Sequence, residues 1–182
     1  TAPHTPFHLP PANMHSFEDL VDDPDSIAAN PLPYYLAMLE SVDSEMGRLL
    51  DSLSWDEVSN TVVIFLGDNG TPGSAVQSPF TPNRAKGSLH QGGVLVPMVI
   101  SGPGVTRADQ HESALVNTTD LFATIVELTG GAMDVYENSK SLLPLLSQAG
   151  LSHRSCLRAE SGGTLPQAGW VQRNQTHMYI QG

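Results

Sequence analysis

Two short apolar runs, each closed by a glycine-containing turn, constrain the fold more than any other feature of this chain. The first covers residues 60–66 and ends at Gly-Asp-Asn-Gly, and the second covers residues 96–101 and ends at Gly-Pro-Gly. Both runs are rich in β-branched residues, which favour strands. A strand that is apolar on both faces belongs inside a sheet that helices cover. The two runs therefore predict an α/β fold with a buried sheet.

Helical periodicity is found on both sides of these runs. Residues 31–53 carry one apolar stripe at three- and four-residue steps, which predicts an amphipathic helix. Its members are Leu36, Leu39, Val42, Met46, Leu49 and Leu53. A second amphipathic helix is predicted for residues 121–128, with a cap at Thr118-Thr119-Asp120 and a stop at Gly130-Gly131.

The tail is expected to form a small sheet of its own. Asn174-Gln175 would turn its last two strands into a hairpin. The strand candidates are residues 155–160, 169–173 and 176–180. The fold class expected is therefore α/β: part of a mixed, mainly parallel sheet flanked by helices, followed by a small antiparallel sheet. The domains expected are residues 1–150 and residues 151–182.

The negative net charge of the chain argues against some classes of binding partner. The chain has 182 residues, with 8 basic and 19 acidic side chains and a net charge of −11. Nucleic acids and anionic lipids need a basic footprint, so neither is an expected partner. Five carboxylates lie in residues 16–30, but the spacing of an EF-hand loop is missing, so we interpret this segment as a solvated acidic loop.

Three other features of the sequence limit what the chain can form. No apolar run approaches membrane-spanning length, so no membrane span is predicted. The single cysteine, Cys156, excludes an internal disulfide and a zinc site built from several cysteines. The chain begins at Thr1 without a methionine, and we interpret it as a piece of a longer protein. Its oligomeric state is not predicted.

Three groups of residues are candidates for chemistry. Asp68 and Asn69 follow the first strand run, where α/β sheets collect ligands, and their oxygens suit calcium or magnesium. The same residues also make a favourable turn. Lys86 begins a glycine-rich stretch and could contact an anionic substrate oxygen, or be an exposed loop lysine. His4 could protonate a leaving group near neutral pH, or simply face solvent.

In chain order, these segments resemble the sulfatase family, within the alkaline-phosphatase-like superfamily. The similar blocks are APHTPFHLPP, YYLAMLESVDSEMGRLLDSL, TVVIFLGDNG, KGSLHQGGVLVPMVISGPGV, TTDLFATIVELTG, SLLPLLS and the tail from SCLRAE to HMYI. The resemblance implies a hydrolase that cleaves sulfate esters with one divalent cation, usually calcium. It assigns Asp68 and Asn69 to the metal, Lys86 to the sulfate, and His4 to the sulfate or the leaving oxygen.

The resemblance also shows what this chain lacks. The family's formylglycine nucleophile arises in a C/S-x-P/A-x-R motif upstream of these blocks, and Cys156 does not match that motif. The two other acidic metal ligands are absent too, so this segment alone is expected to be inactive. The family's EGG-x-R block here has Gln91 and Leu95 at its charged positions. We interpret these as an ion pair lost as a unit, because losing one partner strands a charge.

Two other functions stay open. The parent protein could be a catalytically inactive relative that binds sulfated ligands or calcium. It could also hydrolyse phosphate or phosphonate esters, because a shared fold and metal site do not fix the substrate. The natural sulfate ester is not predicted, and export to the periplasm or secretion follows from the resemblance alone.

Overall fold

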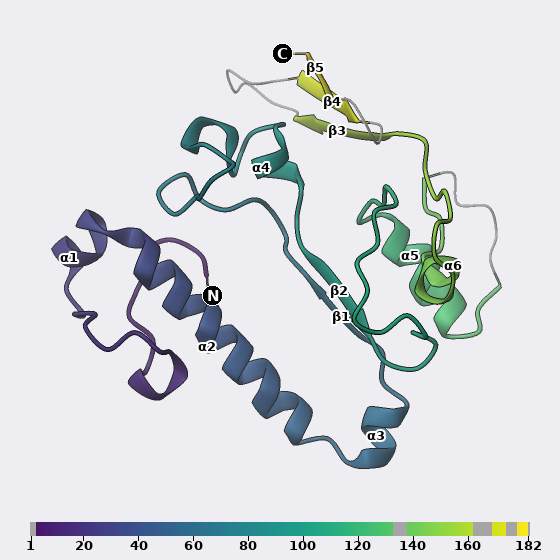
Figure 1. The fold of residues 1–182 in the computed structure, drawn as a ribbon, viewed down its shortest axis with the longest axis horizontal. Helices are drawn as coiled ribbons and strands as arrows, with labels where there is room; N and C mark the ends of the chain where they lie inside the picture. The colour runs from purple at the N-terminus through teal and green to yellow at the C-terminus, as the bar shows by residue number, and fades with distance from the viewer. Residues whose placement is uncertain (1–2, 133–137, 162–168, 174–177, 182) are drawn as a thin grey trace. The chain divides into compact units, whose positions relative to one another are not determined.

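The computed structural model describes residues 3–132, 138–161, 169–173 and 178–181. The contacts divide the chain into two compact units, each formed by two stretches of sequence (Figure 1). The first unit comprises Thr1–Asn60 and Gly67–Val96, and the second comprises Thr61–Leu66 and Pro97–Gly182. All four predicted site residues belong to the first unit.

A long helix organises the first unit. Helix α2 (Pro31–Asp51) confirms the predicted helix, and its buried residues meet the N-terminal segment in one core. Phe7, Tyr34, Met38 and Ala75 form this core, and partly buried apolar residues surround it. Two prolines at the start of α2 are compatible with the helix because its first N–H groups have no intrahelical acceptor.

Shorter elements complete this unit. Helix α1 (Pro24–Ala29) lies in the segment predicted to be a loop, because the Asp23 carboxylate accepts the N–H of Ser26 and caps a first turn that contains proline. Helix α3 (Trp55–Ser59) begins with a capping box from Ser54 and Glu57. Two 3₁₀ turns (Ala12–Met14 and Pro82–Arg84) and helix α4 (Gln91–Val94) lie in the remaining loops.

The second unit contains both predicted apolar strands. Strand β1 (Val63–Leu66) pairs with strand β2 (Met98–Ser101) in antiparallel register, with Phe65 opposite Val99 (Figure 1). The mainly parallel sheet expected from the sequence is therefore not confirmed. Apolar runs on two strands predict burial on both faces, but they do not specify strand direction, which depends on the connection between the strands.

The rest of the second unit follows the predicted order. Helix α5 (Asp120–Leu128) and helix α6 (Leu143–Ser147) contact each other. Strands β3 (Leu157–Ser161), β4 (Gly169–Arg173) and β5 (Met178–Gln181) form an antiparallel sheet in sequence order, which confirms the small terminal sheet. The predicted turn at residues 174–175 lies outside the described residues. The boundary predicted at residue 150 stays a prediction.

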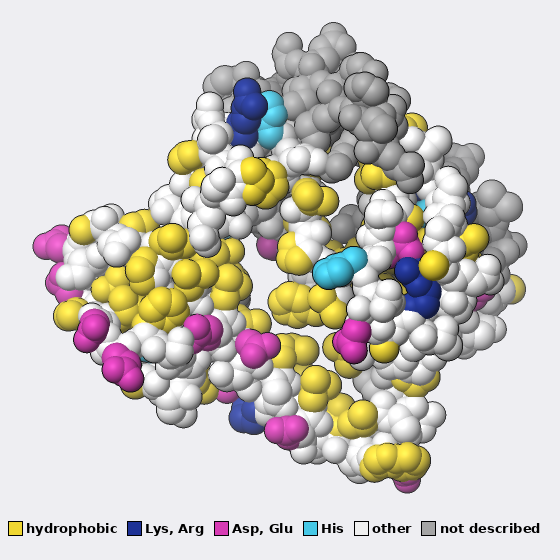
Figure 2. Space-filling model, in the orientation of Figure 1, with side chains coloured by type: hydrophobic (Ala, Val, Ile, Leu, Met, Phe, Trp, Pro, Cys, Tyr) yellow, Lys and Arg dark blue, Asp and Glu magenta, His cyan; other side chains and the backbone are white. Residues whose placement is uncertain are grey.

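The first unit has an apolar surface patch, and the described helices have no membrane-spanning character. Hydrophobic side chains gather over the N-terminal segment and α2, and carboxylates lie around them (Figure 2). Among the helices that the structure describes, none combines the length and the apolar character needed to cross a membrane.

Candidate functional site

Asp68 and Asn69 lie in the turn that follows β1, and both residues are exposed. The turn continues into Gly70, which is buried and donates its N–H to the carbonyl of Gly93 at 3.1 Å. The two candidate metal ligands are therefore attached to a fixed backbone point while their side chains remain open to solvent.

Lys86 is joined to the same turn through its backbone. Its N–H donates to the carbonyl of Thr71 at 3.0 Å. Around it, Ala85, Ser88 and Leu89 are buried, while Lys86 itself is half-buried. The backbone at Lys86 is therefore anchored, and both interpretations of its side chain stay open.

His4 lies in the extended N-terminal segment and is exposed. Its Nδ1 is 2.6 Å from the carbonyl oxygen of Thr5. A carbonyl can only accept a hydrogen bond, so Nδ1 is the donor in this contact, which leaves Nε2 for another partner.

Helix α2 carries both the His4 segment and the turn after β1. Phe7 lies three residues after His4, and its ring packs against Tyr35 with centroids 5.6 Å apart. The hydroxyl of Tyr35 lies 3.4 Å from the hydroxyl of Thr71, and Ala75 joins the same buried core as Phe7. The unit thus ties the segments that bear His4, Asp68 and Lys86 to one helix.

Asp68 and Asn69 are the kind of ligand that a hard cation prefers, but two residues are too few to complete its coordination shell. A carboxylate and a carboxamide oxygen are ligands that calcium and magnesium prefer, and calcium takes six to eight oxygens. Within the described part of the chain, no group of three or more His, Cys, Asp or Glu side chains is placed to hold a metal ion. Asp68 and Asn69 could therefore supply part of a coordination shell that other groups must complete.

The two positions that depart from the family pattern lie next to this region. Gln91 begins α4, and Leu95 follows its end with 55% of its surface exposed. The N–H of Leu95 donates to the carbonyl of Gln91 at 2.8 Å. The two residues are thus joined through the backbone. The ion-pair interpretation of the lost charges stays a prediction.

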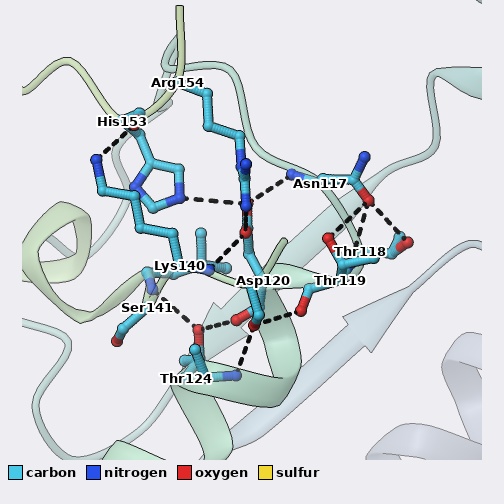
Figure 3. Close-up of polar contacts among 12 residues, drawn as sticks. Asn117, Thr118, Thr119, Asp120, Thr124, Lys140, Ser141, His153 and Arg154 are labelled. Atoms are coloured by element: carbon cyan, nitrogen blue, oxygen red, sulfur yellow. Dashed lines mark hydrogen bonds and ion pairs between the residues drawn. The ribbon is translucent and has the colours of Figure 1, made fainter. Parts of the chain in front are cut away.

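The sequence interpretation missed a buried polar cluster in the second unit (Figure 3). Its centre is Asp120, the first residue of α5, whose side chain is fully buried. Both carboxylate oxygens accept hydrogen bonds from the guanidinium of Arg154, and the N–H groups of Asn117 and Lys140 donate to them at 2.9 Å. His153 Nε2 lies 3.2 Å from the same carboxylate.

This cluster changes the role predicted for the residues before α5. The Thr119 side chain makes no capping hydrogen bond to the helix, so the predicted cap at residues 118–120 is wrong for that threonine. The Asp120 carboxylate points instead to residues 117, 140, 153 and 154. No local sequence pattern could predict these contacts of Asp120, because Lys140, His153 and Arg154 are distant from it in the chain.

Contacts within the cluster shift the pKa values of its three ionisable side chains, Asp120, His153 and Arg154. Burial acts to raise the pKa of Asp120, but hydrogen bonds from Arg154 and from the two backbone N–H groups outweigh it and leave that pKa below its usual value. Burial lowers the pKa of His153 despite the neighbouring carboxylate. The hydrogen bond to Asp120 raises the pKa of Arg154.

The known proteins that this chain resembles in sequence include sulfatases. The sequence model of the Sulfatase family matches residues 1–132. The chain is 28% identical to arylsulfatase K of Canis lupus familiaris over 116 residues, which cover 63% of this chain and 21% of that protein. The chain thus spans about a fifth of the length of that curated relative.

Solved structures agree on the fold. Ps i-CgsB, solved in complex with k-i-k-neocarrahexaose, matches with a TM-score of 0.76 and 24% identity, over 100% of this chain and 39% of that one. The phosphonate monoester hydrolase SpPMH of Silicibacter pomeroyi matches with a TM-score of 0.68 and 20% identity, over 90% of this chain and 34% of that one. Because the family match covers well over half of the residues, this chain belongs to the sulfatase family.

Proposed function

We propose that this chain is part of a sulfatase that hydrolyses sulfate esters with a divalent cation, with calcium as the expected ion. The observation that carries the proposal is the family match over residues 1–132, which contain Asp68, Asn69, Lys86 and His4. The formylglycine nucleophile of this proposal would lie upstream of Thr1, in a part of the parent protein that this chain does not include.

Each residue has a distinct task in the proposal. Asp68 and Asn69 offer oxygen atoms to the cation, and a bound cation would supply positive charge to the sulfate oxygens. The ammonium of Lys86 neutralises charge on the same oxygens. His4 holds a proton on Nε2 for the leaving oxygen. Cleavage of a sulfate ester concentrates negative charge on these oxygens, so cationic groups on both sides stabilise it.

The structure supports this assignment through backbone contacts. The turn bearing Asp68 and Asn69 is bonded to Gly93, and the backbone of Lys86 is bonded to the next residue of that turn, Thr71. The backbones of two segments that are separated in the sequence are therefore adjacent, which supports the proposal.

Hydrolysis of an aryl sulfate by the parent protein tests the proposal. Lys86→Ala and His4→Ala should each lower kcat/KM for 4-nitrophenyl sulfate by about 10²-fold or more, as expected when a group that stabilises developing charge or transfers a proton is removed. His8→Ala is the matched control for His4, because both are exposed histidines of the N-terminal segment, and Arg84→Ala is the control for Lys86, because it removes a nearby exposed cationic side chain. Equal losses in test and control variants would contradict the assignment.

The same assay separates the alternatives. Turnover of 4-nitrophenyl phosphate or a phenyl phosphonate ester in preference to the sulfate would favour the phosphonate hydrolase, whose fold is shared by SpPMH. Binding of sulfate without any turnover, in a parent protein that lacks an upstream C-x-P-x-R segment, would favour the inactive relative. The present 182-residue chain should release no phenol in multiple turnovers.

A further inference from the structure

Three glycines in the first unit leave no room for a side chain. A Cβ on Gly70 would lie 2.0 Å from the carbonyl oxygen of Gly92 and 2.7 Å from Cα of Gly93. On Gly92 it would lie 2.4 Å from the oxygen of Arg84, and on Gly93 it would lie 2.1 Å from the oxygen of Ser88. The clashing atoms are backbone atoms, which cannot swing away as the end of a flexible side chain can.

These glycines are required for close approach and not for an unusual backbone conformation. Gly87, in the same segment, has a φ of +86° and open space where a Cβ would lie. None of Gly70, Gly92 and Gly93 has a φ in the left-handed region. Glycine at position 70 therefore brings the turn into contact with residues 92–93. Glycine at positions 92 and 93 lets α4 approach residues 84–88 of the segment that bears Lys86.

Two hydrogen bonds fix this contact. The N–H of Gly70 donates to Gly93 at 3.1 Å, and the N–H of Lys86 donates to Thr71 at 3.0 Å. One bond runs from the turn to the glycine-rich segment, and the other runs in the reverse direction. Together with the interlocked glycines, they join the turn bearing Asp68 to the segment bearing Lys86.

We propose that Gly70, Gly92 and Gly93 are positioning residues that set the distance between the Asp68–Asn69 oxygens and the Lys86 ammonium. The proposal rests on the proposed function, because it concerns the same anion site. The contact uses backbone atoms alone, so it does not require the charged residues that relatives carry at positions 91 and 95. The uncharged residues Gln91 and Leu95, which differ from the family pattern, therefore do not disturb this backbone contact.

The expected effect of a substitution follows from the distances. A contact of 2.0 Å must open by about 1 Å to reach 3.0 Å, the distance below which real Cβ atoms are essentially never found. A misplacement of about 1 Å in an active site can cost roughly 10²-fold in rate. Gly70→Ala should therefore separate the turn from the segment that bears Lys86, while every side chain of the candidate site remains present.

Hydrogen exchange measured by NMR on the 182-residue chain tests the contact directly. In the wild-type chain, the amides of Gly70 and Lys86 should be protected, and unprotected amides there would overturn the proposal however the variants behave. In Gly70→Ala the amides of residues 70 and 86 should both exchange at least about tenfold faster, because the hydrogen bonds that protect them open locally. Met38 in α2 is the internal reference. Gly47→Ala is the matched control, because nothing lies within 4 Å of its Cβ.

Binding of inorganic sulfate by the parent protein tests the positioning role. With roughly 10 mM calcium chloride, above the range of weak protein calcium sites, wild-type affinity for sulfate should rise about fivefold or more, the lower end of ordinary coupling between two ligands. Gly70→Ala should abolish this increase and leave sulfate affinity without calcium within about threefold. A full increase in Gly70→Ala, with both amides opened, would overturn the positioning role. No increase in the wild-type parent protein would instead contradict the proposed function, while the exchange data would still decide the contact.

Discussion

The fully buried carboxylate of Asp120 offers the sharpest test of how the second unit is stabilised. Asp120→Ala removes the acceptor for the guanidinium of Arg154 and for the N–H groups of Asn117 and Lys140. Removing one partner of a buried ion pair costs roughly 3–5 kcal/mol, and the low end of that range applies here because the side chain of Arg154 is 23% exposed. We expect a loss in the free energy of unfolding within that range.

Urea unfolding, followed by hydrogen exchange of defined peptides, measures this loss. With an m value of about 2 kcal/mol/M, the midpoint of the second unit should fall by about 1.5–2.5 M. Peptides from α5 and α6 should lose protection, while peptides from α2 in the first unit should keep it. Glu127→Gln is the matched control, because Glu127 is an exposed carboxylate on the same helix and such changes stay within about 0.5 kcal/mol.

A double mutant tests the physical reason for the loss. Arg154→Met should also destabilise the unit, but adding it to Asp120→Ala should cost less than the sum, because the remaining charge is removed as well. A coupling of about 1–3 kcal/mol is expected. If Asp120→Ala costs no more than Glu127→Gln, or if the two substitutions are strictly additive, the carboxylate is not the centre of this cluster in energetic terms.

Three further predictions follow from the packing and the charges. The pKa values of Asp120 and His153 both lie below their unfolded values, so protonation of either group destabilises the fold. Stability, measured as the urea midpoint, should fall as the pH drops below about 6.5, where His153 becomes protonated, and should fall again below about 3.8, where Asp120 becomes protonated. A midpoint that is constant from pH 7.5 to 5 would contradict the first step. Met38→Ala should cost roughly 2–5 kcal/mol in chemical unfolding, because Met38 is fully buried in the core of the first unit; a loss below about 1 kcal/mol would show that the core collapses around the cavity. Phe65 and Val99 are paired across β1 and β2 with 39% and 59% of their surfaces exposed, so the chain should bind a hydrophobic dye, and Val99→Lys should reduce that fluorescence without lowering stability.

The sequence and the structure agree best where a local pattern determines the outcome. The apolar stripe of residues 31–53 predicted α2 almost to its ends, since the positions that face a core recur at the helical period. The β-branched runs predicted β1 and β2, and the tail predicted three short strands. The position of Asp68 and Asn69 directly after the first run also came from the chain order alone.

Contacts between distant segments were not available from those patterns. The antiparallel pairing of β1 with β2 depends on how the chain between them returns, and the apolar composition of two strands is the same for either direction. Asp120 looked like an ordinary helix-start residue, because aspartate is favourable in the first turn for local reasons. Only folding brings Arg154 and His153 to its carboxylate.

The candidate site shows the same division. The sequence by itself determined which side chains carry the chemistry: an acid–amide pair, a lysine and a histidine, in an order that resembles one family. Only the tertiary structure decided that the acid–amide turn and the lysine segment touch, through glycines at positions 70, 92 and 93. The physical reason is that close packing between backbones depends on the absence of a Cβ in three dimensions, which no spacing along the chain reveals.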